Sequence, residues 1–120
     1  MIEMHIVKTF TLSAGNTGLS ETIDLGSTTL FAIEMPDAWQ AAAITFLASS
    51  TKNGTFKSVY DDSGTEVTIA SANISAGRFI VPDSVAIKLA PFRYLKLRSG
   101  TAATPVNQTV DRQFSIVAKA

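Results

Sequence analysis

Tyr94-Leu95-Lys96-Leu97-Arg98 alternates apolar and polar side chains. A period of two is the side-chain period of a β-strand, which turns one set of side chains to a core and the other to solvent. The same alternation recurs at residues 56–60, 66–70 and 110–117. The pattern predicts half-buried strands and places Lys96 and Arg98 together on an exposed strand face.

Turn residues separate the alternating segments at short intervals. Asn53-Gly54 predicts a type I′ hairpin turn, because both central residues of that turn need positive φ. Asp62-Ser63-Gly64 predicts a second tight turn. About nine short strands with turns between them predict an all-β fold, an antiparallel β-sandwich or a barrel.

The remaining segments are less regular. Further strands are predicted at residues 6–12, 19–25, 30–35, 42–49 and 78–81, and Val85, Ile87 and Leu89 alternate in the same way. Pro36 ends the third of these strands, and a turn or one helical turn is predicted at residues 37–40. Within residues 30–35, Phe31, Ile33 and Met35 share one predicted face and Leu30 and Ala32 the other, a pattern typical of a central or covered strand.

Length and composition indicate one domain, residues 1–120, without covalent cross-links. The chain has no cysteine, in agreement with folding in a reducing cytosol. The first residues include Glu3 and are followed by no apolar segment of signal-peptide type. The longest apolar stretch, residues 41–48, is too short to cross a bilayer. We therefore expect a soluble protein made in the cytoplasm, without a membrane partner.

The charge pattern favours association with other proteins. Ten basic and ten acidic residues give a formal net charge of zero, and no basic stripe suited to nucleic acid is visible. Charged residues make up 17% of the chain, against about 25% in typical soluble domains. A neutral, sparsely charged surface is prone to associate. We expect a homo-oligomer or a multi-copy assembly, although a Ser/Thr-rich monomer fits the same composition.

Catalytic and metal-binding motifs do not emerge from the sequence. His5 is the single histidine, and without cysteine it does not suggest a zinc site. Asp61, Asp62 and Glu66 could hold calcium around Ser63-Gly64, but the same residues are good turn chemistry. No nucleophile-elbow motif or phosphate-binding loop is present in the sequence. We expect no enzymatic activity and no cofactor.

Three aromatic side chains carry a polar group that suits ligand stacking. Trp39, Tyr60 and Tyr94 could each stack on a sugar or anchor a partner if exposed. The position of Trp39, beside a turn and before a core strand, favours a core role for it.

Two stretches resemble galactose-binding-like, or discoidin-type, jelly rolls. The first comprises Pro36-Asp37-Ala38-Trp39, Ala43-Ile44-Thr45-Phe46, Ser49-Ser50 and Asn53-Gly54-Thr55-Phe56, and the second is Phe92-Arg93-Tyr94-Leu95-Lys96-Leu97. With the segment that connects them, they span about half of the chain. The resemblance implies a jelly-roll-like β-sandwich and, as one function, a carbohydrate-binding module that contacts a host surface.

The whole layout resembles small virion proteins of tailed bacteriophages more closely. The Thr/Ser/Ala-rich strands, the Pro-x-x-Trp segment and the run Leu97-Arg98-Ser99-Gly100-Thr101 carry this resemblance. It implies a head decoration or tail-associated protein that is located in the virion, needs no cofactor and has other virion proteins as partners.

Termini and long loops are the places where partner contacts are most easily built. We therefore expect partner contacts from the N-terminal segment and from the loop at residues 99–108. The candidate residues are Ile2, Met4, His5, Gly100, Thr101, Pro105 and Val106.

Overall fold

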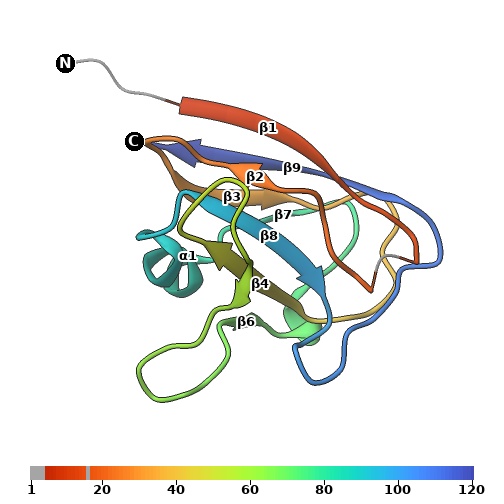
Figure 1. Cartoon of the computed structure of the whole chain (residues 1–120). Helices are drawn as coiled ribbons and strands as arrows, with labels where there is room; N and C mark the ends of the chain where they lie inside the picture. The colour runs from red at the N-terminus through yellow and green to blue at the C-terminus, as the bar shows by residue number, and fades with distance from the viewer. Residues whose placement is uncertain (1–4, 16) are drawn as a thin grey trace.

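The computed structural model describes residues 5–15 and 17–120 (Figure 1). In this part of the chain it contains nine strands, one short α-helix and one turn of 3-10 helix. The strands are β1 (His5–Leu12), β2 (Ile23–Asp24), β3 (Thr29–Glu34), β4 (Ile44–Ser49), β5 (Lys57–Ser58), β6 (Thr68–Ile69), β7 (Phe79–Ile80), β8 (Tyr94–Ser99) and β9 (Arg112–Lys119). The helices are η1 (Ser71–Asn73) and α1 (Asp83–Leu89).

The strands form two sheets with the order of a jelly roll. One sheet has the order β1-β9-β3-β7, and the other has the order β2-β8-β4-β5, with β6 paired to β4. Every strand pair within the described residues is antiparallel. Successive strands alternate between the sheets from β1 to β4, as in a double-sheet jelly roll. The all-β antiparallel sandwich predicted from the alternating segments is confirmed.

One hydrophobic cluster fills the space between the two sheets. Phe10 of β1, Phe114 and Ile116 of β9, and Phe46 and Leu97 of the facing sheet are all nearly inaccessible to solvent. The rings of Phe10 and Phe114 stack with centroids 5.3 Å apart. Alternation along β9 therefore sends one set of side chains into this core and leaves the other set on the outer face of the sheet.

The alternation of Val85, Ile87 and Leu89 predicted a strand, and this prediction is wrong. These residues lie in α1, where Val85 and Leu89, four positions apart, are buried and Ile87 is exposed. Pro82 precedes the helix, and its carbonyl accepts a hydrogen bond from the Ala86 N–H at 2.7 Å. Spacings of two and of four are both present in so short a run, so the periodicity alone was ambiguous. Among the described residues, no helix has the length and apolar character that a membrane crossing needs.

The hairpin between β4 and β5 is present, but its predicted type I′ turn is wrong. Neither Asn53 nor Gly54 has a positive φ. Residues 50–56 form a longer loop, in which the Gly54 N–H donates to the Thr51 carbonyl at 3.3 Å. A Cβ at Gly54 would meet the hydroxyls of Thr51 and Ser49, so a close approach rather than a positive φ favours glycine there.

Two other segments are shorter or less regular than predicted. Residues 19–25 contain only the two-residue strand β2, preceded by isolated bridges at Leu19 and Ser20. Residues 37–40 contain a bend and no helical turn. The proposed turn at residues 62–64 is present, with Gly64 at φ 81°.

Candidate interaction surface

The outer face of the sheet β1-β9-β3-β7 carries a group of apolar side chains, which we call the outer apolar row. Val7 of β1 and Ala32 of β3 both lie opposite Val117 of the central strand β9. Phe79 of β7 points outward beside Glu34. The row consists of Val7, Phe31, Phe79, Val81 and Val117. Four of these side chains are 49–60% exposed, and Val117 is half-buried.

A β-bulge in β3 places Phe31 on this outer face. The pairing of β3 with β9 shifts register between Leu30 and Ala32, so Phe31 is an extra residue in the strand. Leu30 and Ile33 consequently both point into the core. The predicted face shared by Phe31, Ile33 and Met35 is therefore wrong at Phe31, while the central position of the strand is confirmed. The Lys119 ammonium lies 5.2 Å from the centre of the Phe31 ring, a cation–π distance.

The loop between β8 and β9 is built on a sharp turn at Gly100. Gly100 has φ 90°, and its N–H donates to the Ala43 carbonyl at 2.7 Å. The Thr101 N–H donates to the Thr104 carbonyl at 3.1 Å, and the Val106 N–H donates to the Ser99 carbonyl at 2.9 Å. A Cβ at Gly100 would lie 2.5 Å from the Thr104 carbonyl oxygen. This segment is therefore a folded turn in the isolated chain.

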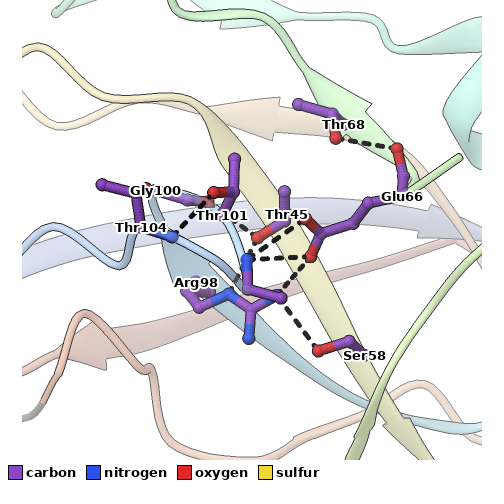
Figure 2. A network of polar contacts seen from close by, with 9 residues as sticks. Thr45, Ser58, Glu66, Thr68, Arg98, Gly100, Thr101 and Thr104 are labelled. Atoms are coloured by element: carbon purple, nitrogen blue, oxygen red, sulfur yellow. Dashed lines mark hydrogen bonds and ion pairs between the residues drawn. The ribbon is translucent and has the colours of Figure 1, made fainter.

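A buried ion pair joins strand β8 to the segment before β6, next to the loop (Figure 2). The Arg98 guanidinium pairs with the Glu66 carboxylate, and their side chains are only 8% and 13% exposed. Arg98 also donates to Thr45 Oγ1 at 3.0 Å and to Ser58 Oγ at 3.2 Å. The predicted exposed position of Arg98 is therefore wrong, because partners distant in the sequence cover it.

The Glu66 carboxylate contacts the loop directly, and Arg98 is linked to the loop through the Thr45 hydroxyl. The Ala102 N–H donates to the two Glu66 carboxylate oxygens at 3.1 and 3.2 Å. The Thr45 hydroxyl donates to the Gly100 carbonyl at 2.7 Å. The network in Figure 2 thus holds the loop, strand β4 and the segment before β6 in one arrangement.

Gln108 fixes the second half of the loop. Its side-chain NH₂ donates to Ser99 Oγ at 2.8 Å and to the Gln40 carbonyl at 3.0 Å. Its amide oxygen accepts from the Gln40 N–H and from Arg112 Nε, each at 2.9 Å. The Gln108 side chain is buried, so these contacts satisfy an amide that would otherwise be costly to bury.

The candidate contact residues of the loop differ in accessibility. Gly100 is buried, Thr101 and Val106 are half-buried, and Pro105 is exposed at the tip beside Thr104. Ile2 and Met4 lie outside the described residues, and His5 begins β1. The structure thus leaves the tip of the loop exposed to solvent and uses its base for internal contacts.

The three candidate stacking aromatics lie in three different environments. Trp39 packs against the core with its ring edge-on to Phe114 at 5.5 Å, the role that its sequence position favoured. Tyr94 is half-buried, with the Arg93 guanidinium 5.1 Å from its ring centre. Tyr60 is 53% exposed and lines a cleft of about 520 Å³ together with Phe92, Lys57 and several hydroxyl side chains.

The acidic residues considered for calcium binding point to separate partners. Glu66 is paired with Arg98. Asp61 Oδ1 accepts from the Ser63 N–H at 2.9 Å and from the Thr65 N–H at 3.1 Å, while Oδ2 accepts from Lys88 Nζ at 3.3 Å. The Ser63 hydroxyl also donates to Oδ1 at 2.6 Å, and this hydrogen bond leads the interactions that lower the pKa of Asp61 to about 2. Within residues 5–15 and 17–120, no group of three or more His, Cys, Asp or Glu side chains is placed to hold a metal ion.

A surface ion pair between Asp24 and Arg93 predicts a modest acid sensitivity. Arg93 Nε donates to Asp24 Oδ1 at 2.8 Å, and this hydrogen bond, followed by one from the Gly26 N–H, lowers the pKa of Asp24 from 3.8 to about 2. Because the folded-state pKa is the lower one, Asp24 stabilises the fold above about pH 4 and loses that contribution as the pH falls toward about 2.

We expect Asp24→Asn to flatten the dependence of the urea unfolding midpoint on pH between about pH 4 and pH 2. The effect is small, because both side chains are exposed to a third or more and water screens the pair. Glu21→Gln serves as the control. Glu21 lies in the same segment, but its side chain accepts from the Thr11 N–H, whereas Arg93 pairs with Asp24. An identical pH dependence in Asp24→Asn and the parent chain would contradict the expectation.

The outer apolar row was not identified from the sequence. Its one signal was the apolar character of both faces of residues 30–35, which indicated a covered strand. The bulge and the pairing of β1, β9 and β7 with β3 are long-range features, and they determine which side chains reach the outer face.

Comparison with known proteins gives a fold-level relationship. No protein-family model matches the chain, and no curated protein matches it in sequence. Among solved structures, the chain is similar to a protein described as "SPBc2 prophage-derived protein YomS", with a TM-score of 0.50 and 12% sequence identity. The match covers 100% of this chain and 98% of that one. The two chains therefore share an overall fold along their whole lengths.

Proposed function

We propose that the chain is a structural protein of a bacteriophage particle, a capsid decoration or head-associated subunit. In this proposal it resides in the virion and acts by protein–protein contact with other virion proteins, in many copies and without catalysing a reaction. The fold shared end to end with a prophage-derived protein supports a phage origin.

The observation that carries the proposal is the outer apolar row on the sheet β1-β9-β3-β7. Val7, Phe31, Phe79 and Val81 leave large apolar side chains in water on one face. Contiguous exposed apolar patches typically mark interaction sites. Burial contributes about 25 cal/mol per Å² of apolar surface, so a modest contact repeated over many copies stabilises a particle.

The loop between β8 and β9 supports the same function. Its turn at Gly100, the Arg98–Glu66 pair and the Gln108 contacts hold its tip in place in the isolated chain. Because the loop is already folded, it loses little conformational entropy when a partner binds. A small contact area at Thr104 and Pro105 therefore suffices for useful affinity.

We expect Phe31→Asp to weaken binding to capsids of the phage whose genome encodes the chain by about tenfold or more, because a charge would be buried at the contact. Binding is measured by co-sedimentation of purified protein with capsids that lack it. Ile87→Asp is the matched control, since Ile87 is 77% exposed on α1 and is not part of the row. Failure of the parent chain to bind capsids, or equal losses in both variants, would contradict the proposal.

A carbohydrate-binding function is the second candidate, and the exposure of Tyr60 favours it. Tyr60 stands at the cleft shared with Phe92 and the hydroxyls of Ser50, Thr51 and Thr55. An aromatic ring beside hydroxyl groups is a suitable surface for a sugar. Binding on a glycan array that is lost in Tyr60→Ala, in a chain that ignores capsids, would favour this alternative.

A further inference from the structure

Strand β1 has an outer hydrogen-bonding edge to which no other strand of the described residues pairs. It lies at the end of the sheet β1-β9-β3-β7 and pairs with β9 along its whole length, from His5 opposite Lys119 to Leu12 opposite Arg112 (Figure 1). An unpaired edge presents a row of N–H and C=O groups to which another strand can bind.

The contacts of Thr11 show which backbone groups face this free edge. The Thr11 N–H donates to Glu21 Oε1 at 3.2 Å, and its carbonyl accepts from the Glu21 N–H at 3.1 Å, both on the side away from β9. In an antiparallel sheet, alternate residues of a strand direct their N–H and C=O to the same side. The backbone groups of Val7 and Thr9 therefore also face away from β9.

Glu21 protects one end of this edge and leaves the other end open. It occupies both backbone groups of Thr11, and Leu12 forms a bridge with Ser20. No hydrogen bond within the described residues occupies the N–H or C=O of Val7 or Thr9 on this side. The open part of the edge is thus residues 5–9.

We propose that this edge binds a second copy of the chain, with the two β1 strands antiparallel and Val7 on the two-fold axis. Val7 then pairs with the partner's Val7 and Thr9 pairs with the partner's His5. In this register, the outward backbone groups of Val7 and Thr9 all find partners within β1. The proposal specifies one contact of the multi-copy assembly proposed above. It rests on that proposed function only for the biological role of the dimer.

Charge and the Glu21 contact disfavour the two registers whose axis lies closer to the C-terminal end of β1. A two-fold axis at Lys8 would place two lysines directly opposite each other, which is destabilising. An axis at Thr9 would pair Val7 with Thr11, whose backbone groups Glu21 already occupies. With the axis at Val7, Lys8 lies opposite Ile6 of the second copy instead.

The surroundings of the edge suit a second copy. Val7 is 59% exposed, and on the axis it would contact its own counterpart, an apolar β-branched pair of the kind that stabilises sheets. The outer apolar row would then continue from Val117 and Val7 of one copy into the other. A cleft of about 340 Å³ separates residues 8–10 of β1 from residues 21–24.

The first test removes the outward N–H of Val7. Val7→Pro is expected to abolish dimerisation, because proline cannot donate to the partner strand but is tolerated where an edge N–H faces solvent. Val7→Ala keeps the N–H and is expected to retain the dimer with weaker affinity. Sedimentation velocity gives the oligomeric state, and circular dichroism shows that both variants are folded. A monomeric parent chain, or a dimer unchanged in a folded Val7→Pro, would overturn the proposal.

The second test determines the register of the two paired β1 strands, and it does not depend on the proline variant. The parent chain has no cysteine, so a single-cysteine variant can form a disulfide only between the two copies of the substituted residue. On the axis, the two copies of residue 7 lie about 5.5 Å apart at Cα, within disulfide range, whereas the two copies of residue 9 lie about 14 Å apart.

Val7→Cys is expected to form a disulfide-linked dimer on mild oxidation, and Thr9→Cys is expected to remain monomeric on a non-reducing gel. Cross-linking of Thr9→Cys in preference to Val7→Cys would overturn the register. These readouts need no capsid, so a dimer that ignores capsids would contradict the decoration function and leave the edge pairing supported.

Discussion

Replacement of Arg98 by methionine is expected to lower the free energy of unfolding by about 3–5 kcal/mol. The change leaves the Glu66 carboxylate nearly buried without its cation, and it leaves the Thr45 and Ser58 hydroxyls without the guanidinium. The fixed geometry of the loop between β8 and β9 depends on the same contacts. Urea unfolding followed by circular dichroism measures the effect.

Two further variants separate burial from charge as the cause. Arg93→Met removes an arginine from the exposed pair with Asp24 and is expected to cost far less than Arg98→Met, because water screens that pair. Arg98→Met combined with Glu66→Met removes both buried charges and is expected to recover part of the loss. Equal destabilisation by Arg98→Met and Arg93→Met would show that burial does not set the strength of the Arg98–Glu66 pair.

Truncation of Phe114 to alanine is expected to cost about 3–5 kcal/mol. Phe114 lies on the central strand β9, is completely buried, and contacts the rings of Phe10 and Trp39. Its removal opens a cavity between two sheets that cannot close without moving their strands. Thermal and urea unfolding of the variant give the measurement.

Phe79→Ala is the matched control for this prediction. Phe79 belongs to the same sheet but is 60% exposed on its outer face, so its truncation should change stability by about 0.5 kcal/mol or less. A large loss in Phe79→Ala would indicate that the outer apolar row contributes to the fold of the single chain. A loss below about 1 kcal/mol in Phe114→Ala would contradict the described core.

Local features of the sequence predicted most of the strands and their antiparallel arrangement. Residues 94–98 and 110–117 alternate clearly, and they correspond to β8 and to most of β9. Local features were insufficient where two periods fit the same residues. Val85, Ile87 and Leu89 satisfied the spacing of a strand and, in part, that of the helix α1.

The candidate interaction surface could be predicted only in part. The loop at residues 99–108 was visible as a long segment with Gly100 and Pro105, but its internal contacts to Glu66, Ala43 and Gln40 were not. The exposure of Phe31 depends on a bulge opposite Val117, and the free edge of β1 depends on which strands pair. Neither feature has a local signature.

By itself, the sequence determined that this protein is an antiparallel β-sandwich with a sparsely charged surface, because side-chain alternation and charge content are properties of the chain at each position. Only the tertiary structure decided that Arg98 is buried, that Phe31 faces outward and that β1 has an open edge. Each of these depends on residues distant in the sequence, such as Glu66, Val117 and Glu21, that the fold brings into contact.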